Sequence, residues 1–231
     1  MLESMHKHMK WIMWIIVGLI TVAFLFFGIY PSDSGRGMAA SVNGDVITTE
    51  EWNRVYQNMH DMYREILKGK FDEGFAKTLR AQALRELVTE RLLVQEAERQ
   101  GLRVTDQELQ AAIMRIPAFN QQGVFSQTNY EGYLRQDNMT PALFETQQRE
   151  VLLRQKIEHL VEDSVDVTDA ELPALYAAKN PKAKPGDFQK NRTSFRQSVL
   201  KEKQRAALDG YVARLGNKAK IKVGENTFAR D

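Results

Sequence analysis

Hydrophobic and polar residues are distributed along this chain in two different ways. Residues 11–30 (WIMWIIVGLITVAFLFFGIY) are apolar or neutral throughout and carry no charge. Beyond residue 48, apolar residues recur every three or four positions, which is the pattern of amphipathic helices with one buried face. The sequence therefore predicts an all-α or mostly α-helical protein, with one apolar N-terminal helix followed by a helical body.

The apolar run has the length of a membrane span. At about 1.5 Å per residue, it reaches roughly 30 Å, the thickness of the hydrocarbon core. Lys7 and Lys10 precede it, so the positive-inside rule predicts residues 1–10 in the cytoplasm and residues 31–231 on the other side. The alternative is a cleaved signal peptide, whose apolar core is usually about 7–15 residues long. We therefore expect an uncleaved transmembrane helix at 11–30.

The body is predicted to begin after a short tether. Residues 31–37 are small, polar and glycine-rich. A β-prone run at 41–48 is broken by Asn43-Gly44-Asp45, a sequence that favours a tight turn. Helices are then expected at about 48–68, 73–100, 105–116, 130–136, 140–161 and 187–215, with a loop at 118–127.

Three segments share one helix-start pattern, in which a threonine is followed three residues later by a glutamate: Thr48–Glu51, Thr105–Glu108 and Thr168–Glu171. In such a capping box the hydroxyl accepts a backbone N–H and the carboxylate reaches back to the threonine N–H. The spacing of the segments is unequal and the sequence between them does not recur. We interpret them as one capping device used three times, and not as repeats.

The C-terminal segment ends in a short strand at Ile221–Val223, which needs a partner. The other clear strand material lies at 41–48, so we expect the two ends of the body to pair. On this hypothesis residues 38–178 and the closing helix and strand of 187–231 form one domain.

The sequence contains few residues or motifs that indicate catalysis, metal binding or cofactor binding. It has no cysteine and four scattered histidines, which excludes disulfides, thiol catalysis and Cys-ligated zinc. It carries neither the glycine-rich phosphate-binding motifs nor the HExxH and GxSxG motifs of hydrolases. We expect no enzyme activity, no metal and no cofactor.

The net charge of +2 conceals an asymmetry. Residues 31–178 hold 16 basic and 24 acidic side chains, whereas residues 179–231 hold 14 basic and 5 acidic ones. No nucleic-acid-binding motif accompanies the basic segment, so nucleic acid is not an expected partner. Packing of the basic segment on the acidic body is favoured, and an anionic membrane or ligand surface is the alternative.

Methionine and aromatic side chains are the remaining signal. Such side chains suit surfaces that bind varied apolar segments, because thioethers repack easily and rings offer large contact areas. The competing interpretation is that most of them line the core, although the loop-like region 119–133 suggests exposed phenylalanines. The candidate binding residues are Met59, Met62, Met114, Phe119, Phe125, Tyr130, Tyr133 and Met139.

Four runs carry a resemblance to a known family: VNGDVITTEEW (42–52), ALRELVTERLLVQEAERQGLRVTDQEL (83–109), IPAFNQQGVFSQTNYEGYLRQDNMTPALFETQQREVLLRQKI (116–157) and VDVTDAEL (165–172). In order, spacing and turn residues they resemble the N-terminal chaperone domain of the SurA and PpiD family. The segment VARLGNKAKIKV is similar to the helix and strand that close the same module. The resemblance implies a periplasmic chaperone, anchored in the inner membrane, that holds unfolded, newly exported polypeptides without ATP, with the secretion channel as a further partner.

The chain departs from that family at one place. Relatives carry parvulin-type prolyl isomerase domains before the closing element, where this chain has only residues 179–186 (KNPKAKPG). The resemblance therefore argues against isomerase activity. The alternative from a different class is a non-catalytic adaptor that docks one envelope or secretion-channel partner. A prolyl isomerase is the third hypothesis, but the sequence lacks the parvulin domain that this activity would need.

Overall fold

The structure is a computed structural model of the 231-residue chain that describes residues 37–67, 72–184 and 186–224. Residues Met38–Asp231 form one compact unit, separate from Met1–Gly37. The predicted membrane span at 11–30 lies outside the described residues. Within the residues that are described, no helix combines the length and the apolar character needed to cross a bilayer.

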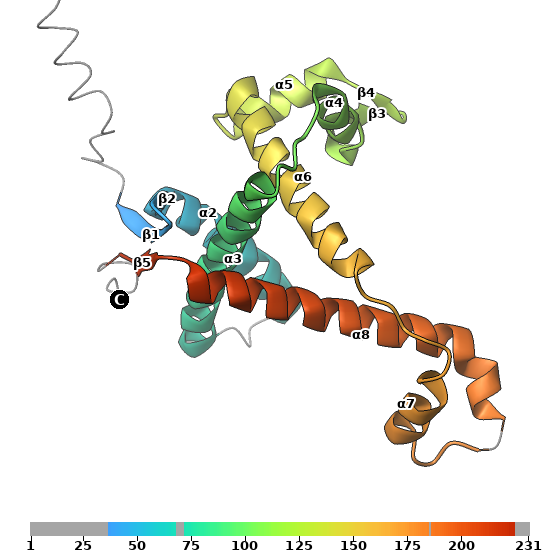
Figure 1. Ribbon diagram of the computed structural model, residues 1–231. Coiled ribbons are helices and arrows are strands. Elements are labelled where there is room, and N and C mark those ends of the chain that lie inside the picture. The colour runs from blue at the N-terminus through green and yellow to red at the C-terminus, as the bar shows by residue number, and fades with distance from the viewer. Residues whose placement is uncertain (1–36, 68–71, 185, 225–231) are drawn as a thin grey trace, which may run out of the picture. The chain divides into compact units, whose positions relative to one another are not determined.

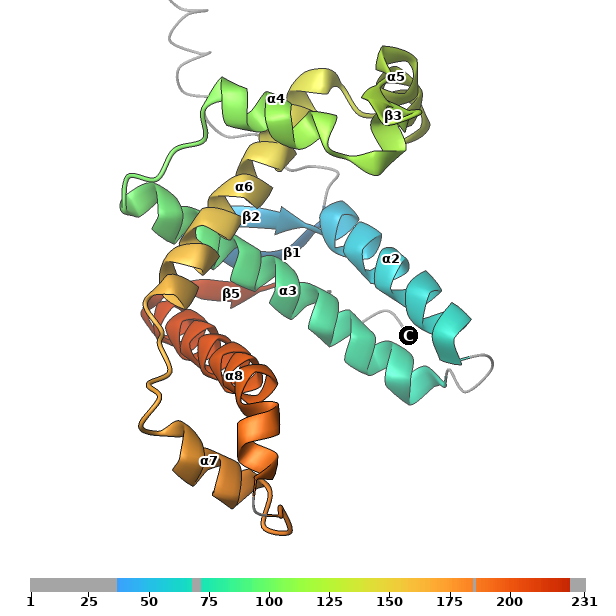
Figure 2. The same cartoon turned by 90° about the vertical axis from the view of Figure 1, so that its right-hand side faces the viewer.

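Helices dominate the unit that begins at Met38, and a small sheet accompanies them (Figures 1 and 2). The helices are α2 (Thr49–Leu67), α3 (Glu73–Arg99), α4 (Asp106–Met114), α5 (Gln127–Gln136), α6 (Pro141–Asp163), α7 (Leu172–Lys179) and α8 (Asp187–Lys218), with a 3-10 turn η1 (Pro117–Phe119). The strands are β1 (Met38–Val42), β2 (Asp45–Thr48), β3 (Asn120–Gln121), β4 (Val124–Phe125) and β5 (Ile221–Val223). The expected mostly helical body with a small strand pairing is confirmed.

The sheet has the order β2-β1-β5, with both pairings antiparallel. Asn43 and Gly44 form the turn between β1 and β2 with φ of 56° and 97°. This is the left-handed backbone for which Asn-Gly is the favoured sequence. On the other side of β1, Ala40 lies opposite Val223. The prediction that the two ends of the body pair is confirmed (Figure 1).

The main core lies where α2 and α3 cover the sheet. Ala40, Val42 and Ile47 of the sheet are fully buried against these helices. Trp52 of α2 joins them, and its indole N–H donates to the carbonyl oxygen of Arg80 at 3.0 Å. Burying this apolar surface is the main favourable contribution to folding, at about 25 cal/mol per Å².

A largely buried arginine connects four elements. The guanidinium of Arg91 on α3 lies 2.8 Å from Glu51 of α2, 3.2 Å from Glu150 of α6 and 3.4 Å from Asp45 of β2. Its side chain is only 14% exposed. Burial raises the pKa of Glu51 and of Glu150, and the charge of Arg91 opposes that rise. The four side chains therefore form one charged junction, which we call the Arg91 junction.

The long helix α8 packs on α3 and α6. Leu93 and Ala97 of α3 and Ile157 of α6 are buried there, and Tyr211 and Val212 of α8 cover them. The helix runs to Lys218, through the Gly-Asn pair that the sequence predicts as its end. Gly216 lies inside the helix and packs near Leu92, where an added Cβ would make an ordinary contact at 3.9 Å, so this glycine does not end the helix.

Several cations of α8 are paired with acidic residues, as the charge asymmetry predicts. Arg192, Arg196 and Lys203 of α8 bind Asp169, Asp166 and Glu171 respectively, and Glu202 of α8 binds Lys179. The acidic partners of the three cations come from the segment just before α7. These ion pairs therefore join the basic segment to α7 and to the residues that directly precede α7.

The third capping pattern does not start a helix where the sequence predicts one. The backbone N–H of Thr168 donates to Glu171 at 2.8 Å, but residues 169–171 form a turn and α7 begins at Leu172. Pro173 lies in the first turn of α7, where its missing N–H leaves no helical hydrogen bond unmade. The proline therefore shifts the start of the helix and does not weaken its interior.

Candidate functional site

The region expected to be a loop with exposed phenylalanines forms a small aromatic core instead. Phe119 is only 1% exposed, and its ring lies 5.3 Å from Tyr130 and 5.6 Å from Phe144, between centroids. The backbone N–H of Ser126 donates to the carbonyl oxygen of Phe119 at 2.7 Å, which closes the β3–β4 hairpin over the ring. The expectation that Phe119 is exposed is therefore wrong, because hairpin closure buries a residue whose neighbours show no helical period.

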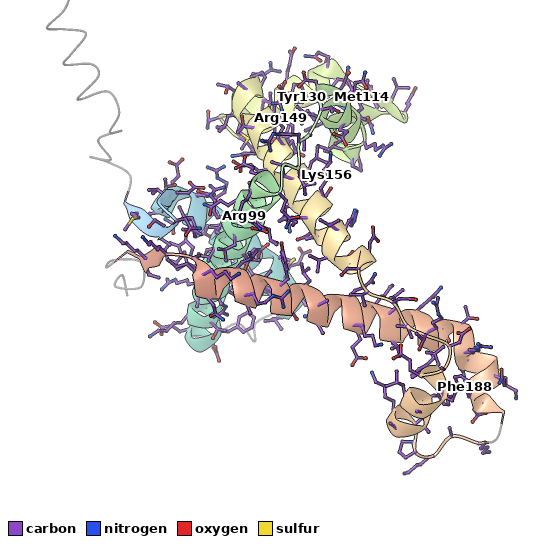
Figure 3. The ribbon with its side chains drawn as sticks, in the orientation of Figure 1. Arg99, Met114, Tyr130, Arg149, Lys156 and Phe188 are labelled. Carbon is purple, nitrogen blue, oxygen red and sulfur yellow. The ribbon has the colours of Figure 1, made fainter. Side chains whose placement is uncertain are left out.

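An open groove runs beside this aromatic core, between α4, β4, α5 and α6. Its volume is about 390 Å³, which lies in the range of sites that hold a few side chains. Five apolar or aromatic residues form its floor: Leu109, Ile113, Met114, Phe125 and Tyr130. Polar residues form its rim: Asp106, Gln110, Gln127, Glu145 and Arg149. We call this the α4–α6 groove; of the residues that line it, Met114, Tyr130 and Arg149 are labelled in Figure 3.

Ion pairs fix the walls of the groove. Arg149 of α6 lies 2.8 Å from Asp106 at the start of α4 and 3.9 Å from Glu145. About two turns further along α6, Lys156 lies 2.6 Å from Glu108 of α4. Because the charge of Lys156 and the threonine N–H of the capping box both bind its carboxylate, the pKa of Glu108 falls to about 2. The capping box of α4 is complete, as the sequence predicts.

The predicted binding residues lie in three places. Met114, Phe125 and Tyr130 line the groove, and Met114 is 47% exposed. Phe119, Tyr133 and Met139 belong to the aromatic core below it, where Met139 is partly buried and Tyr133 half exposed. Met59 and Met62 lie on α2 and are not part of the groove lining; Met59 packs on the main core and Met62 is 50% exposed.

The groove also contains residues that the sequence does not single out as binding residues. Leu109 and Ile113 read as the buried stripe of a helix, yet with Met114 they present one face of α4 to the groove. The spacing of four residues between Leu109 and Ile113 indicates that the two side chains share one face of the helix. Asp106 and Arg149, in contrast, are distant in the sequence, and only the packing of α4 on α6 brings them together.

A second hollow, of about 250 Å³, lies along α3 and does not share these properties. It is lined entirely by polar and charged side chains: Gln82, Arg85, Glu86, Thr89, Glu90 and Arg154. Among the described residues, no group of three or more histidine, aspartate or glutamate side chains is arranged to hold a metal ion. The α4–α6 groove is therefore the better candidate for binding apolar segments.

Comparison with known proteins identifies the family. The model of the SurA-like N-terminal domain matches residues 1–158. The chain belongs to the SurA-like N-terminal domain family.

Relatives of known name agree with this assignment. The chain is 35% identical over 153 residues to the periplasmic chaperone PpiD of Escherichia coli K12. The alignment covers 62% of this chain and 24% of PpiD. It is 30% identical over 143 residues to the chaperone SurA of Burkholderia orbicola. This alignment covers 62% of this chain and 30% of SurA. The chain thus spans about a quarter of the length of PpiD and under a third of that of SurA.

A solved structure shares the fold. It comes from work on PEB4 and the periplasmic protein Cj1289, two SurA-like chaperones of Campylobacter jejuni. The match has a TM-score of 0.52 at 14% identity, and it covers 82% of this chain and 99% of the solved one. The fold of the described unit is therefore SurA-like.

Proposed function

We propose that this chain is a membrane-anchored periplasmic chaperone that holds unfolded, newly exported polypeptides without ATP and without prolyl isomerase activity. Its family membership and the chaperone names of its relatives support the general class. The apolar run 11–30 supports an inner-membrane anchor, with residues 1–10 in the cytoplasm. Residues 179–186 stand, in this proposal, where relatives carry a parvulin domain.

The observation that carries the proposal is the α4–α6 groove. It combines an apolar floor with the partly exposed thioether of Met114 and the ring of Phe125. A client side chain that enters it exchanges water for apolar contacts, and each such contact contributes a small free energy. A thioether adapts to side chains of different shape, so binding is broad and reversible. Anchoring then raises the local concentration of the groove where exported chains emerge.

Light scattering tests the holding activity. A denatured outer-membrane protein is diluted into buffer with increasing amounts of residues 38–231, the compact unit that contains the described core. We expect aggregation to be suppressed near a 1:1 ratio, with no effect of added ATP. The same protein should not accelerate isomerisation of a prolyl peptide bond. A folded protein that leaves scattering unchanged would refute the proposal and favour an adaptor for a single partner.

Paired variants test the groove itself. Replacing Met114 and Phe125 together by serine should weaken client binding about tenfold, because it removes two apolar contacts from a partly exposed floor. The matched control replaces Ile66 and Leu160, which are more than half exposed and lie outside the groove. If both double variants bind clients equally well, the groove is not the binding site. The holding activity itself is tested by the scattering experiment and does not depend on this result.

A further inference from the structure

Strand β5 forms one edge of the β2-β1-β5 sheet (Figure 2). Among the described residues, β1 is the only strand that pairs with it. Its apolar residues Ile221 and Val223 are 39% and 50% exposed, and Lys222 between them is exposed as well. An edge strand presents backbone N–H and C=O groups to whatever lies beside it. β5 therefore offers both the backbone groups and the apolar side chains with which a further strand adds to a sheet.

The hydrogen bonds between β5 and its neighbour show which backbone groups face outward. The N–H of Gly224 donates to Ala39, and the carbonyl oxygen of Lys220 accepts from the N–H of Asn43, each over 2.9 Å. Alternate residues of an antiparallel strand face the same neighbour, so the backbone of Lys222 faces β1 as well. The two apolar residues of β5 consequently direct their N–H and C=O groups away from β1.

The side chains of β5 divide between the two faces of the sheet. Val223 lies opposite Ala40 and Ile221 opposite Val42, and these two β1 residues are fully buried in the main core. Lys222 points to the other face, because side chains alternate along a strand. A strand added beside β5 would therefore set its own apolar side chains next to Ile221 and Val223 and cover the part of them that is exposed.

Lys222 defines the charge that suits an added strand. No ion pair found among the described residues includes Lys222, and the exposed Lys218 and Lys220 precede it. Because its backbone bonds to β1, Lys222 would face the added strand as a non-hydrogen-bonded pair, in which side chains approach most closely. Opposite charges in such a pair stabilise the sheet and like charges destabilise it. The complementary residue is therefore aspartate or glutamate.

The same geometry argues against a second copy of this chain at the edge. Two β5 strands related by a twofold axis would place Ile221 opposite Val223 of the second copy. That register sets Lys222 directly against Lys222, which is destabilising. The occupant that fits the edge is a different segment, with a carboxylate where β5 has its lysine.

We propose that the open edge of β5 binds an extended polypeptide segment as an added antiparallel strand, with aspartate or glutamate opposite Lys222 and apolar residues opposite Ile221 and Val223. This inference rests on the proposed chaperone function, in which unfolded exported chains supply such segments. Main-chain hydrogen bonds give the affinity in this mode of binding, and they tolerate many sequences. Only two residues of β5 bond outward, so binding is weak and reversible.

A lysine in a short edge strand also has a purely protective role, because it discourages pairing with strands of other chains. In that role Lys222 would keep peptides away from β5. Binding that depends on particular peptide N–H groups and on the sign of the peptide charge therefore separates the two interpretations.

Fluorescence anisotropy of labelled peptides tests the proposal with the full chain in nanodiscs, and empty nanodiscs serve as the blank. The probe is Thr-Val-Glu-Val-Thr. N-methylation of both valines removes the N–H groups that would bond to β5, whereas N-methylation of the glutamate and the last threonine removes two that point away. Lys222→Glu reverses the charge of the edge. Lys190→Glu, at an exposed position of α8, makes the same change of net charge elsewhere.

We expect the peptide methylated at both valines to bind about tenfold more weakly than the probe, and the other methylated peptide to bind within about twofold of it. Lys222→Glu should weaken binding of the probe about fivefold and favour a peptide with lysine in place of glutamate by a similar factor. Lys190→Glu should change neither. A probe that does not bind, or that binds regardless of which N–H groups are methylated, would overturn the inference.

Val223→Pro gives a second variant that keeps the ladder with β1, because it removes an outward N–H and proline is tolerated on edge strands. It should weaken binding of the probe. If the chain instead self-associates in sedimentation and Val223→Pro dissociates it, a second copy occupies the edge and the inference is wrong.

The light-scattering experiment separates this inference from the proposed function. A chain that suppresses aggregation but fails the peptide test refutes the inference alone. A chain that passes the peptide test without suppressing aggregation refutes the chaperone function and leaves β5 as a peptide-binding edge.

Discussion

Tyr211 of α8 donates a hydrogen bond to the carboxylate of Glu96 on α3, with 3.0 Å between the two oxygens and 115 residues between them in the sequence. Glu96 is buried and also accepts from Arg99 and Gln100. The bond joins the closing helix to the centre of the helical body. It is one reason why α8 and α3 belong to the same compact unit.

Removing this hydroxyl should destabilise the unit. We expect Tyr211→Phe to lower the free energy of unfolding by about 1–3 kcal/mol, because a hydrogen bond to a buried carboxylate is lost while the ring is kept. Urea denaturation of residues 38–231, followed by circular dichroism, measures the change. Tyr176→Phe is the control, because Tyr176 lies in α7 and its hydroxyl accepts only a long, exposed hydrogen bond from Asn191. Equal stability of both variants would contradict this role of Tyr211.

The same carboxylate predicts a dependence on pH. Hydrogen bonds from Arg99, Gln100 and Tyr211 hold the pKa of Glu96 at about 2, below its ordinary value of 4.5. The folded state therefore binds this proton less readily than the unfolded state, and the resulting stabilisation is complete above pH 4.5. It is lost as the pH falls from about 4.5 toward 2. Glu96→Gln should flatten the stability curve in this range, which urea titrations at each pH would show.

The Arg91 junction should tolerate coordinated changes better than single ones. Arg91→Met leaves Glu51 and Glu150 facing each other without a cation, and we expect a loss of about 3–5 kcal/mol. Adding Glu51→Gln and Glu150→Gln removes two of the three uncompensated charges, leaving only the more exposed Asp45, and should restore more than half of that loss. Denaturation of the single and triple variants compares the two. If the triple variant is less stable than Arg91→Met alone, the charge pairs themselves stabilise the fold.

The aromatic core beside the groove should behave as a true core. Phe119→Ala removes a ring that is almost fully enclosed, so we expect a loss of about 3–5 kcal/mol in the free energy of unfolding. Val124→Ala is the control on the same hairpin, since its side chain is 70% exposed, and it should change stability by less than about 0.5 kcal/mol. Both values follow from urea titrations of residues 38–231. A tolerated Phe119→Ala would mean that the hairpin is not held by this ring.

The connection between α7 and α8 should accept an insertion. Residues 180–184 are exposed, and this part of the chain joins α7 and α8, which contact each other through Leu172 and Val199, with Val167 of the segment before α7 in the same cluster. Ten Gly-Ser residues placed after Lys182 should lower the free energy of unfolding by less than about 1 kcal/mol, since loop closure depends only weakly on length. The same insertion after Arg91, inside α3, is the destabilising comparison. Thermal unfolding of both variants gives the contrast.

The sequence predicts the elements of this fold better than their contacts. Periodicity locates the long helices, and Asn43-Gly44 locates the turn, because each depends on residues close in the sequence. The capping box of α4 is likewise local. The predictions that fail depend on more than local sequence: Phe119 is enclosed by a hairpin, and α8 continues through Gly216 to Lys218 while packing on α3.

The candidate site divides in the same way. Met114 and Phe125 are both among the candidate residues taken from composition, and both line the α4–α6 groove, while their role in binding stays a prediction. Met59 and Met62 share that composition but lie on α2. Their helical spacing gives no information on which neighbour α2 packs against, so composition alone overestimates the extent of the site.

The pairing of β1 with β5 also sets an order of events in time. A polypeptide is synthesised from its N-terminus, so β1 emerges with its edge toward β5 unpaired and remains so until nearly the whole body has followed. Contacts this far apart in sequence form slowly, because a long loop must close first. During that interval the newborn protein displays an unpaired strand edge of its own, and it is itself in need of protection from aggregation until its last strand arrives.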